Sequence, residues 1–256
     1  MARPRRRIKS AERTLALLEL FSRERQPVTV GEVARALAMP QPSASMLLGN
    51  LSDLGYLHQD TASRTFSPSI RVALLGSWVN RQFAEAGAIG EALDRVQRAT
   101  GETAFLGIQN GAAAQYIMRQ RHDRPDRLLI ESGLYRSLTS SAVGRALLMP
   151  KADHEVLALA RRSNAEAEDD RNRVNVRDFL AAIRRFRHQG YAETAGDTRP
   201  GFSAIALPFK SPMGQEAMAV GVGGRSADIR RKRQRILHAL RVFKATYDAS
   251  PPLQMP

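Results

Sequence analysis

Residues 29–57 read TVGEVARALAMPQPSASMLLGNLSDLGYL, and this stretch decides the fold of the N-terminal part of the chain. Thr29 is a typical helix N-cap, and Val33, Ala34 and Leu37 then recur at the spacing of one helix face. The prolines at positions 40 and 42 cannot continue a helix interior, so a turn is expected at residues 39–42. A longer helix follows from residue 42 to residue 54, with leucines at positions 47, 48, 51 and 54, and Gly55 ends it.

The flanking residues complete this pattern. Residues 10–22 predict a first helix, with Leu15, Leu18 and Phe21 on one face. Residues 56–59 and 65–68 predict two strands joined by the polar turn 60–64. This order of elements predicts a winged helix-turn-helix, whose third helix leaves its polar N-terminal face free for the major groove of DNA. Any three-helix domain with a hairpin has the same order, so the pattern alone leaves that alternative open.

The remainder of the chain predicts a second, larger domain. Residues 70–100 are largely helical, broken near Gly87 and Gly90, and include a linker helix that carries Trp78. The expected strands are 103–108, 114–118, 128–130, 191–194, 203–209 and 217–222, and the expected helices are 141–148, 152–161, 176–189 and 227–247. Residues 164–175 are polar and charged, as in a surface loop. We therefore expect an α+β chain with a winged helix-turn-helix at 1–68, a linker helix at 69–84 and a further domain at 85–256.

The composition limits the class of protein. Hydrophobic residues make up 43% and charged residues 25% of the 256 residues, an ordinary globular mixture. The chain has no cysteine, which excludes disulfides, thiolate zinc sites and a cysteine nucleophile. Residues 1–9 are charged with no apolar stretch after them, unlike a signal peptide, and no apolar run is long enough for a membrane span. We expect a cytoplasmic protein with no membrane partner.

The charge balance favours a polyanionic partner. The formal net charge is +14, from 39 basic and 25 acidic residues. Each Lys or Arg that meets a phosphate releases condensed counterions, which favours nucleic acid. Five positive charges lie in residues 1–9, residues 10–67 are close to neutral, and a second basic run spans residues 225–244. A solvated basic face is the alternative to nucleic-acid binding as the reason for the overall charge excess.

Several motifs carry a resemblance to a known family. Beside the stretches 11–18, 30–37 and 51–57, they include TGET at 100–103, SAVGRALL at 141–148, GYAE at 190–193 and PGFSAIALP at 200–208. With these motifs the chain resembles the IclR family of bacterial transcription regulators, from about residue 10 to residue 247. The resemblance implies a GAF-like effector-binding domain with an antiparallel sheet, a small organic acid or aromatic metabolite as effector, and no cofactor. It also implies a homodimer on double-stranded operator DNA, which can assemble further to a tetramer.

The resemblance also implies which residues line the effector site. Small residues open the helix at 141–148, where free backbone N–H groups favour an anion. Glu193, Ser203, Gly221 and Gly223 align with pocket positions, and the two glycines, like Ser203 and Thr139, differ from residues common in relatives. A roomier pocket would also admit contacts from residues 105, 116 and 118 to a partly aromatic ligand; the alternative is that these three are core. The expected effector-binding residues are Phe105, Met118, Ser140, Ser141, Ala142, Gly144, Glu193, Ser203, Gly221 and Gly223.

The expected DNA contacts follow from the same resemblance. The third helix would turn Gln41, Ser43, Ser45 and Met46 toward the groove, where serine and glutamine can bond bases and methionine can touch thymine methyls. This helix lacks the lysine and arginine of many relatives. Phosphate contacts are therefore expected from the N-terminal arm, namely Arg5, Arg6, Arg7 and Lys9, and from Arg64 at the tip of the wing.

An enzyme is the main alternative from another class. The five histidines are scattered and form no HExxH motif or metal-ligand spacing. Residues 201–205 begin like a nucleophile elbow but lack its closing glycine, and residues 221–225 lack the lysine of a phosphate loop. We expect neither catalysis nor a metal site. A regulator of this architecture that senses no ligand and acts through a protein partner remains a third reading.

Overall fold

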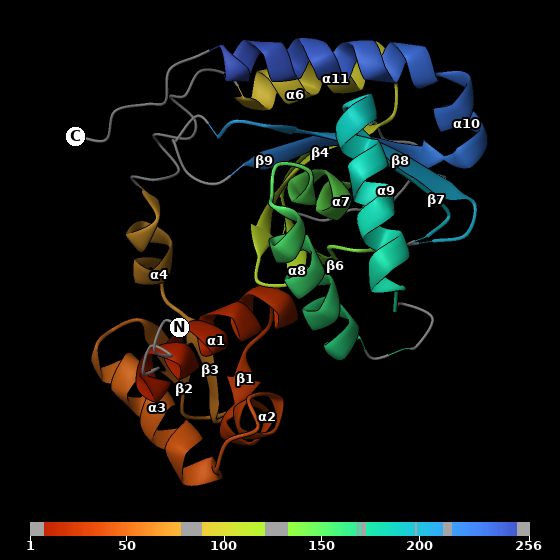
Figure 1. The fold of residues 1–256 in the computed structure, drawn as a ribbon. Coiled ribbons are helices and arrows are strands. Elements are labelled where there is room, and N and C mark those ends of the chain that lie inside the picture. The colour runs from red at the N-terminus through yellow and green to blue at the C-terminus, as the bar shows by residue number, and fades with distance from the viewer. Residues whose placement is uncertain are drawn as a thin grey trace. The chain divides into compact units, whose positions relative to one another are not determined.

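The computed structural model describes residues 8–77, 89–120, 133–167, 169, 173–197, 199–211 and 217–249 (Figure 1). The chain divides into two compact units, Met1–Gln82 and Phe83–Pro256, and each is described by itself. Several expectations fall outside the described residues: Arg5, Arg6 and Arg7 of the arm, Trp78 with the end of the linker helix, and the strand at 128–130. Among the described residues no helix combines the length and the apolar character needed to cross a membrane.

The first unit is the predicted winged helix-turn-helix. Its helices are α1 (Lys9–Glu24), α2 (Val30–Ala36), α3 (Gln41–Asp53) and α4 (Ile70–Leu75). Its strands are β1 (Val28–Thr29), β2 (Leu57–Asp60) and β3 (Thr65–Pro68), which form an antiparallel sheet in the order β1-β3-β2. The hairpin β2–β3 confirms the predicted wing. Strand β1 was not predicted, because two residues paired with Phe66 and Thr65 are too short for a period to appear.

Helix ends in this unit follow directly from the sequence. The hydroxyl of Thr29 accepts a hydrogen bond from the backbone N–H of Glu32, whose carboxylate accepts one from the backbone N–H of Thr29, so the two form a capping box. After α2, the backbone N–H of Met39 bonds to the carbonyl of Ala34 and that of Ala38 to the carbonyl of Arg35. This is a Schellman motif, and it forms the turn between α2 and α3.

Helix α1 carries two apolar stripes, and only one of them is buried in the core of the first unit. Leu17, Leu20 and Phe21 are buried, whereas Leu15 is 62% exposed, so the predicted face was partly wrong. On α3, Leu48 and Leu51 are buried as expected, but Leu54 lies at the helix end and is 58% exposed. Helical spacing predicts both stripes equally, and only the packing of α1 against the other elements distinguishes them.

The second unit is built on a six-stranded antiparallel sheet in the order β6-β5-β4-β9-β8-β7. The described strands are β4 (Thr103–Asn110), β5 (Ala113–Gln120), β6 (Tyr135–Ser137), β7 (Ala192–Ala195), β8 (Phe202–Phe209) and β9 (Met218–Arg225). The described helices are α6 (Ile89–Thr100), α7 (Ala142–Leu148), α8 (Asp153–Ala165), α9 (Val176–Gln189), α10 (Ser226–Arg231) and α11 (Arg233–Asp248). The hairpin turn after Asn110 and the stop of α9 at Gly190, where φ is 82°, confirm two sequence predictions.

Three elements differ from the expectation. Strand β6 was not predicted. Helix α8 continues to Ala165, so the predicted loop begins later, and the side chain of Asn164 then bonds both backbone groups of Val174. The expected helix at 227–247 is two helices that meet at Lys232, whose backbone N–H still bonds to Asp228 while the chain turns. No glycine or proline marks this break in the sequence.

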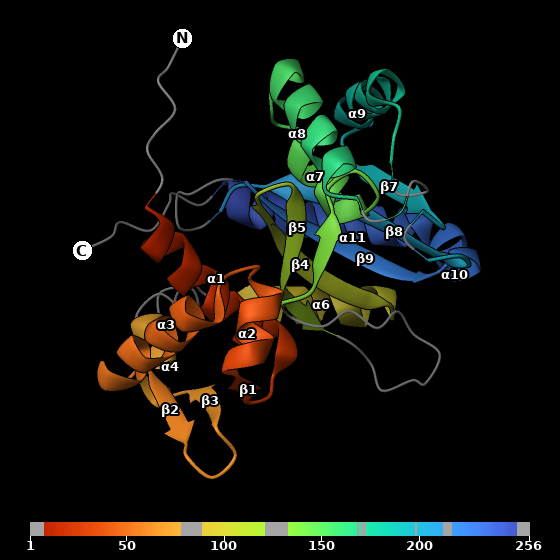
Figure 2. The same cartoon turned by 90° about the horizontal axis from the view of Figure 1, so that it is seen from below.

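The sheet separates two cores (Figures 1 and 2). One side, which we call the α7 face, packs against α7 with α8 and α9, and buries small residues such as Ala192, Ala206 and Ala219. The other side, the α11 face, packs against α6, α10 and α11, and buries larger residues such as Ile205, Leu207 and Val220. Because side chains alternate along a strand, each residue's position in the strand decides which core it joins.

Candidate DNA-reading surface and effector site

Helix α3 presents an uncharged polar and apolar surface. Gln41, Ser45 and Met46 are exposed, Met46 to 71%, while Ala44 and Leu48 are buried on the opposite side. Ser43 is half-buried and is therefore less accessible than the other predicted contacts. No Lys or Arg lies on α3. Such a helix can read base edges, but the attraction to phosphates must come from other residues.

The wing and the start of α1 supply part of that charge. The Asp60 carboxylate accepts hydrogen bonds from the backbone N–H of Ala62 at 2.9 Å and from the Ser63 hydroxyl at 2.7 Å, and these bonds lower the pKa of Asp60. They hold the turn that carries Arg64, which is exposed with φ of 54°. Lys9 is exposed at the first residue of α1.

The α7 face brings part of the predicted effector set together. The cross-strand pairs place Ala192, Ala206, Gly221 and Phe105 in one row, and Thr194, Ala204, Gly223 and Thr103 in the next. Ser141, at the start of α7, packs over the same face and is 2% exposed. Ser140 and Ala142 flank it in sequence. The predicted residues Phe105, Ser141, Ala142, Gly144, Gly221 and Gly223 therefore share one side of the sheet.

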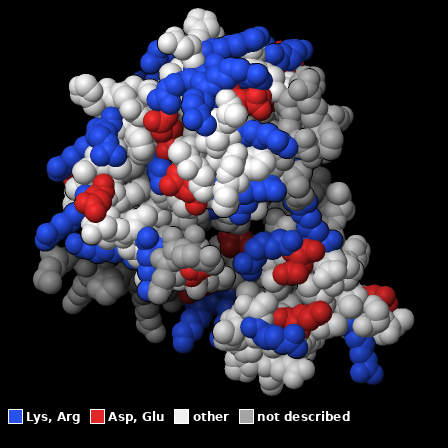
Figure 3. Space-filling view, turned by 90° about the vertical axis from the view of Figure 1, so that its right-hand side faces the viewer, with Lys and Arg blue, Asp and Glu red and all other residues white. Residues whose placement is uncertain are grey.

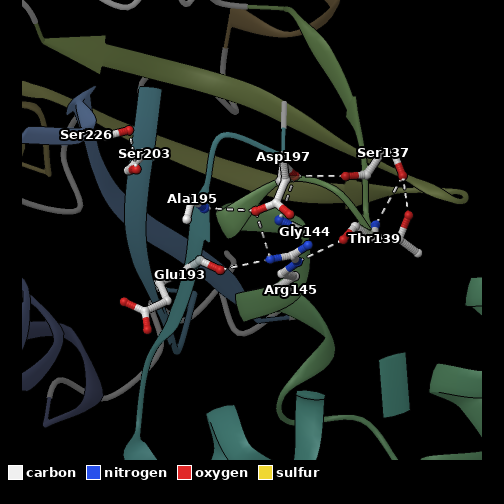
Figure 4. A network of polar contacts seen from close by, with 10 residues as sticks. Ser137, Thr139, Gly144, Arg145, Glu193, Ala195, Asp197, Ser203 and Ser226 are labelled. Atoms are coloured by element: carbon white, nitrogen blue, oxygen red, sulfur yellow. Dashed lines mark hydrogen bonds and ion pairs between the residues drawn. The ribbon is translucent and has the colours of Figure 1, made fainter. Parts of the chain in front are cut away.

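Three predicted effector residues lie on the α11 side of the sheet. The Glu193 carboxylate pairs with Arg233 of α11 at 2.7 Å, and the Ser203 hydroxyl bonds that of Ser226 in α10 at 2.7 Å. Met118 packs in the core of the α11 face. A shift of one residue along a strand reverses the side to which a side chain points. The neighbours Thr194 and Ala204 face α7 in place of Glu193 and Ser203, and Figure 4 shows the Glu193 carboxylate directed away from Arg145.

Two of the predicted glycines serve packing. A β-carbon on Gly144 would lie 2.4 Å from Cα of Leu138 and 2.5 Å from its carbonyl oxygen, so glycine lets α7 approach the preceding chain. Its backbone N–H is also taken, because it donates to the Ser141 hydroxyl at 3.1 Å. A β-carbon on Gly221 would lie 2.4 Å from Cε2 of Phe105. At both positions, atoms of the same unit already fill the space that a β-carbon would take.

A network of buried hydroxyl groups lies beside α7 (Figure 4). The Ser137 hydroxyl is 2.8 Å from that of Thr139 and 2.9 Å from that of Ser163. The Ser141 hydroxyl donates to the Ser137 carbonyl at 2.8 Å. Tyr116, which hydrogen-bonds Ser141, packs edge-to-face on Phe105 with ring centroids 5.2 Å apart. Burial raises the pKa of Tyr116 to about 12, so its hydroxyl stays protonated and can donate.

Arg145 joins α7 to the loop after β7 and was not predicted as a site residue. Its Nε donates to the Thr139 carbonyl at 2.8 Å, and its Nη1 donates to the Glu193 carbonyl at 2.9 Å and lies 3.3 Å from Asp197 Oδ2 (Figure 4). The Asp197 carboxylate also accepts the backbone N–H of Ala195. No sequence signal distinguishes this arginine from the many exposed ones. Its side chain is only 15% exposed because it lies between α7 and the loop after β7, which it links.

Thr103 was also missed, although it is part of the TGET motif. It is 1% exposed, and its hydroxyl has no hydrogen-bond partner in the described part of the chain. It alternates with Ala104, which belongs to the core of the α11 face, so the Thr103 side chain points to the α7 face beside Gly223. A buried hydroxyl without a partner costs about 1–3 kcal/mol, which a bound polar ligand would recover.

Comparison with known proteins assigns both units. A family model described as the IclR helix-turn-helix domain matches residues 10–61, and one described as the bacterial transcriptional regulator IclR C-terminal domain matches residues 86–246. The chain is 25% identical over 217 residues to the HTH-type transcriptional regulator BhcR of Paracoccus denitrificans, covering 85% of this chain and 77% of that protein.

Solved structures show the same fold. An IclR transcriptional regulator from Alicyclobacillus acidocaldarius superposes with a TM-score of 0.77 at 21% identity, over 95% of this chain and 99% of the other. An IclR homologue from Microbacterium hydrocarbonoxydans, complexed with 4-hydroxybenzoate, gives 0.72 at 17% identity, over 94% of this chain and all of the other. Both likenesses extend over the two units.

Proposed function

Because this chain belongs to the IclR family of DNA-binding transcriptional regulators, we propose that a small-molecule effector bound on the α7 face of its sheet changes its affinity for operator DNA. A homodimer would present two α3 helices to successive major-groove half-sites, as two-fold symmetric helix-turn-helix proteins do. The effector changes DNA affinity only as far as it binds the two states of the protein differently, and such coupling is typically about 1–3 kcal/mol.

The unpaired hydroxyl of Thr103 is the observation that carries this proposal. It lies on the α7 face in the row of Thr194, Ala204 and Gly223, whose side chains are small or absent. A polar ligand atom over this row would accept or donate the missing hydrogen bond. Residues 193 and 203 take no part, because their side chains serve contacts with α11 and α10.

The surroundings of this row favour an organic acid with an aromatic or apolar body. The rings of Phe105 and Tyr116 line the same face as an apolar surface, and the Thr103 hydroxyl can donate to a carboxylate. The Microbacterium homologue binds 4-hydroxybenzoate, an acid of this kind. Ser140, Ser141 and Ala142 would border the ligand at the start of α7.

Replacement of Thr103 by valine tests the proposal. First, an operator is selected by the wild-type protein from a randomised duplex library. Its affinity is then measured by fluorescence anisotropy with and without 4-hydroxybenzoate and other small organic acids. We expect at least one acid to change wild-type affinity by about 5- to 150-fold. Thr103→Val should bind operator normally, lose most of that response and unfold at a higher temperature without ligand, because a buried unpaired hydroxyl is gone.

Ser203→Ala is the matched control, since it removes a hydroxyl from the other face of the same sheet and should respond as wild type. A Thr103→Val protein with a full response would place the effector elsewhere. If no acid changes operator affinity, the reading as a regulator that acts without a ligand replaces this one.

A further inference from the structure

The described part of the winged helix-turn-helix is nearly neutral, whereas one segment of the second unit is strongly basic. Residues 8–77 carry seven Lys or Arg and six Asp or Glu, whereas residues 225–244 carry eight and one. Residues 225–244 form α10 and most of α11. The upper part of Figure 3, where these helices lie, shows a dense group of basic side chains.

Half of these basic residues have acidic partners within the second unit. Arg231 pairs with Asp228 at 2.6 Å, Lys232 with the buried Glu102 at 2.5 Å, Arg233 with Glu193 at 2.7 Å and Lys244 with Asp248 at 2.5 Å. Lys232 and Arg233 join α10 and α11 to the sheet. These four cations are therefore accounted for by the fold itself.

Three other arginines of this segment have no acidic partner among the described residues. Arg230, Arg235 and Arg241 are exposed, and none has an ion-pair partner among the described residues. His238 lies between Arg235 and Arg241 on the exposed side of α11, and the two arginines are separated by about 9 Å along the helix at about 1.5 Å per residue. We call Arg230, Arg235 and Arg241 the outer arginine ridge.

The ridge has the chemistry of a phosphate-binding surface. Exposed cations on one basic segment repel one another, and a polyanion reduces that repulsion while releasing its own counterions. Guanidinium groups bind phosphate oxygens in a bidentate manner, which favours phosphate over a diffuse negative field. Duplex DNA presents one negative charge per ~1.7 Å of its axis, and a chain already bound to its operator holds the adjoining DNA at a high effective concentration.

We propose that the outer arginine ridge binds the phosphate backbone of duplex DNA that flanks the operator. This inference rests on the DNA binding of the family and is independent of any effector. The second unit then adds sequence-independent affinity, while the uncharged α3 helix supplies base reading. This division of labour fits a recognition helix that carries no Lys or Arg beside a segment, residues 225–244, that carries eight Lys or Arg and one Asp.

The triple variant Arg230→Gln, Arg235→Gln, Arg241→Gln tests this proposal in the full-length chain. Its affinity is measured between low and high salt on two duplexes, the selected operator alone and the same operator with about 20 base pairs of DNA on each side, two helical turns. Wild type should bind the flanked duplex more tightly and with a steeper salt dependence. Removal of one phosphate contact lowers the slope of log K against log salt by about 0.9, so the variant's slope on the flanked duplex should fall by about 3 per chain. On the operator alone the two proteins should agree.

The matched control is Arg161→Gln, Arg177→Gln, Arg185→Gln. It removes the same charge from exposed positions of α8 and α9, on the other side of the sheet, and should behave as wild type. An equal decrease in this control would show a general effect of net charge and would overturn the proposal. An unchanged slope of log K against log salt in the ridge variant would also overturn the proposal. If in addition poly-glutamate bound the wild type and not the variant, the ridge would be assigned to an acidic protein partner. If no operator can be selected, the proposed base-specific recognition by α3 fails. The ridge is then still tested by comparing the salt dependence of wild type and variant on a mixed-sequence duplex of the longer length.

Discussion

A β-carbon on Gly221 would lie 2.4 Å from Cε2 of Phe105, which is fully buried on the adjacent strand. The same β-carbon would also lie 3.0 Å from the carbonyl oxygen of Ile205 and 3.1 Å from Cβ of Ala206. Gly221 is therefore the position at which the sheet accepts the Phe105 ring. This ring in turn packs on Tyr116, so the glycine sets the position of both aromatic side chains of the α7 face.

Gly221→Ala should accordingly destabilise the second unit. Overpacking of a filled core typically costs about 1–3 kcal/mol, because the ring and the neighbouring strand cannot both move away. Urea denaturation followed by circular dichroism measures the change. Gly90→Ala is the control: the new methyl group would meet only Met118 Sδ at 3.9 Å, and alanine in a helix is favoured over glycine. Equal stability of the Gly221→Ala and wild-type proteins would contradict the packing described here.

The turn of the helix-turn-helix stores strain at Ala38. This residue occupies the left-handed position of the Schellman motif with φ of 47°, where the equivalent residue after α3 is Gly55 with φ of 77°. A non-glycine residue there costs about 1–2 kcal/mol, so Ala38→Gly should raise the stability of the first unit by up to about 1 kcal/mol after the entropy of glycine is subtracted. The melting temperature of the first unit in a thermal unfolding experiment measures this change in stability. Ala36→Gly, two residues earlier in α2, should lower stability instead, and a decrease in both variants would refute the strain.

Base reading should depend on the exposed residues of α3. Ser45→Ala and Met46→Ala are expected to lower the ratio of operator affinity to mixed-sequence affinity by about tenfold for each contact to a base that the substitution removes, with little change in mixed-sequence affinity. Competition binding with the two duplexes gives this ratio. Ser22→Ala on the exposed side of α1 serves as the control. A parallel decrease of both affinities would mean that α3 contacts only the backbone.

The N-terminal arm should act on every duplex. Arg5→Gln, Arg6→Gln, Arg7→Gln removes three of the arm's positive charges, so the salt slope should fall by about 3 per chain on the operator alone as well as on the flanked duplex. This result would separate the arm from the outer arginine ridge, which acts only on flanking DNA. A slope that the arm variant leaves unchanged would remove the arm from the set of phosphate contacts.

Alkaline pH should weaken the fold through Tyr116. Its pKa is raised from 10.0 to about 12 by burial, so between these values the unfolded chain loses a proton that the folded chain keeps. The contribution of Tyr116 to stability is therefore constant below pH 10 and declines as the pH rises toward 12, by at most about 1.4 kcal/mol per pH unit. Tyr116→Phe removes this part of the decline. Denaturation curves at about pH 8, 10 and 11 test it, and parallel pH dependences for the two proteins would contradict the assignment.

Local signals in the sequence were sufficient for the winged helix-turn-helix and for most elements of the larger unit. Thr29 and Glu32 form a capping box, and Gly55 and Gly190 end their helices in the left-handed conformation. These interactions join residues a few positions apart, so the sequence alone contains both partners. The break at Lys232 escaped prediction because the contact that marks it, an ion pair with Glu102, spans 130 positions.

The proposed effector site shows where prediction from sequence ends. Both faces of the sheet are buried, so strands such as β8 and β9 carry apolar residues on both sides and the period of two cannot tell which side meets α7. The family resemblance selected Glu193 and Ser203 on β7 and β8, and both side chains point to the α11 face.

By itself, the sequence determined the order of the elements, the family, and the separation of an uncharged reading helix from the basic segments. Only the tertiary structure decided which residues share a surface. It placed Thr103 and Thr194 on the α7 face, directed Glu193 and Ser203 to the other, and left Arg230, Arg235 and Arg241 without acidic partners among the described residues. The physical reason is that caps and turns act between neighbours along the chain. The face of a strand and the partner of a charge are instead set by long-range packing, which the order of residues does not encode locally.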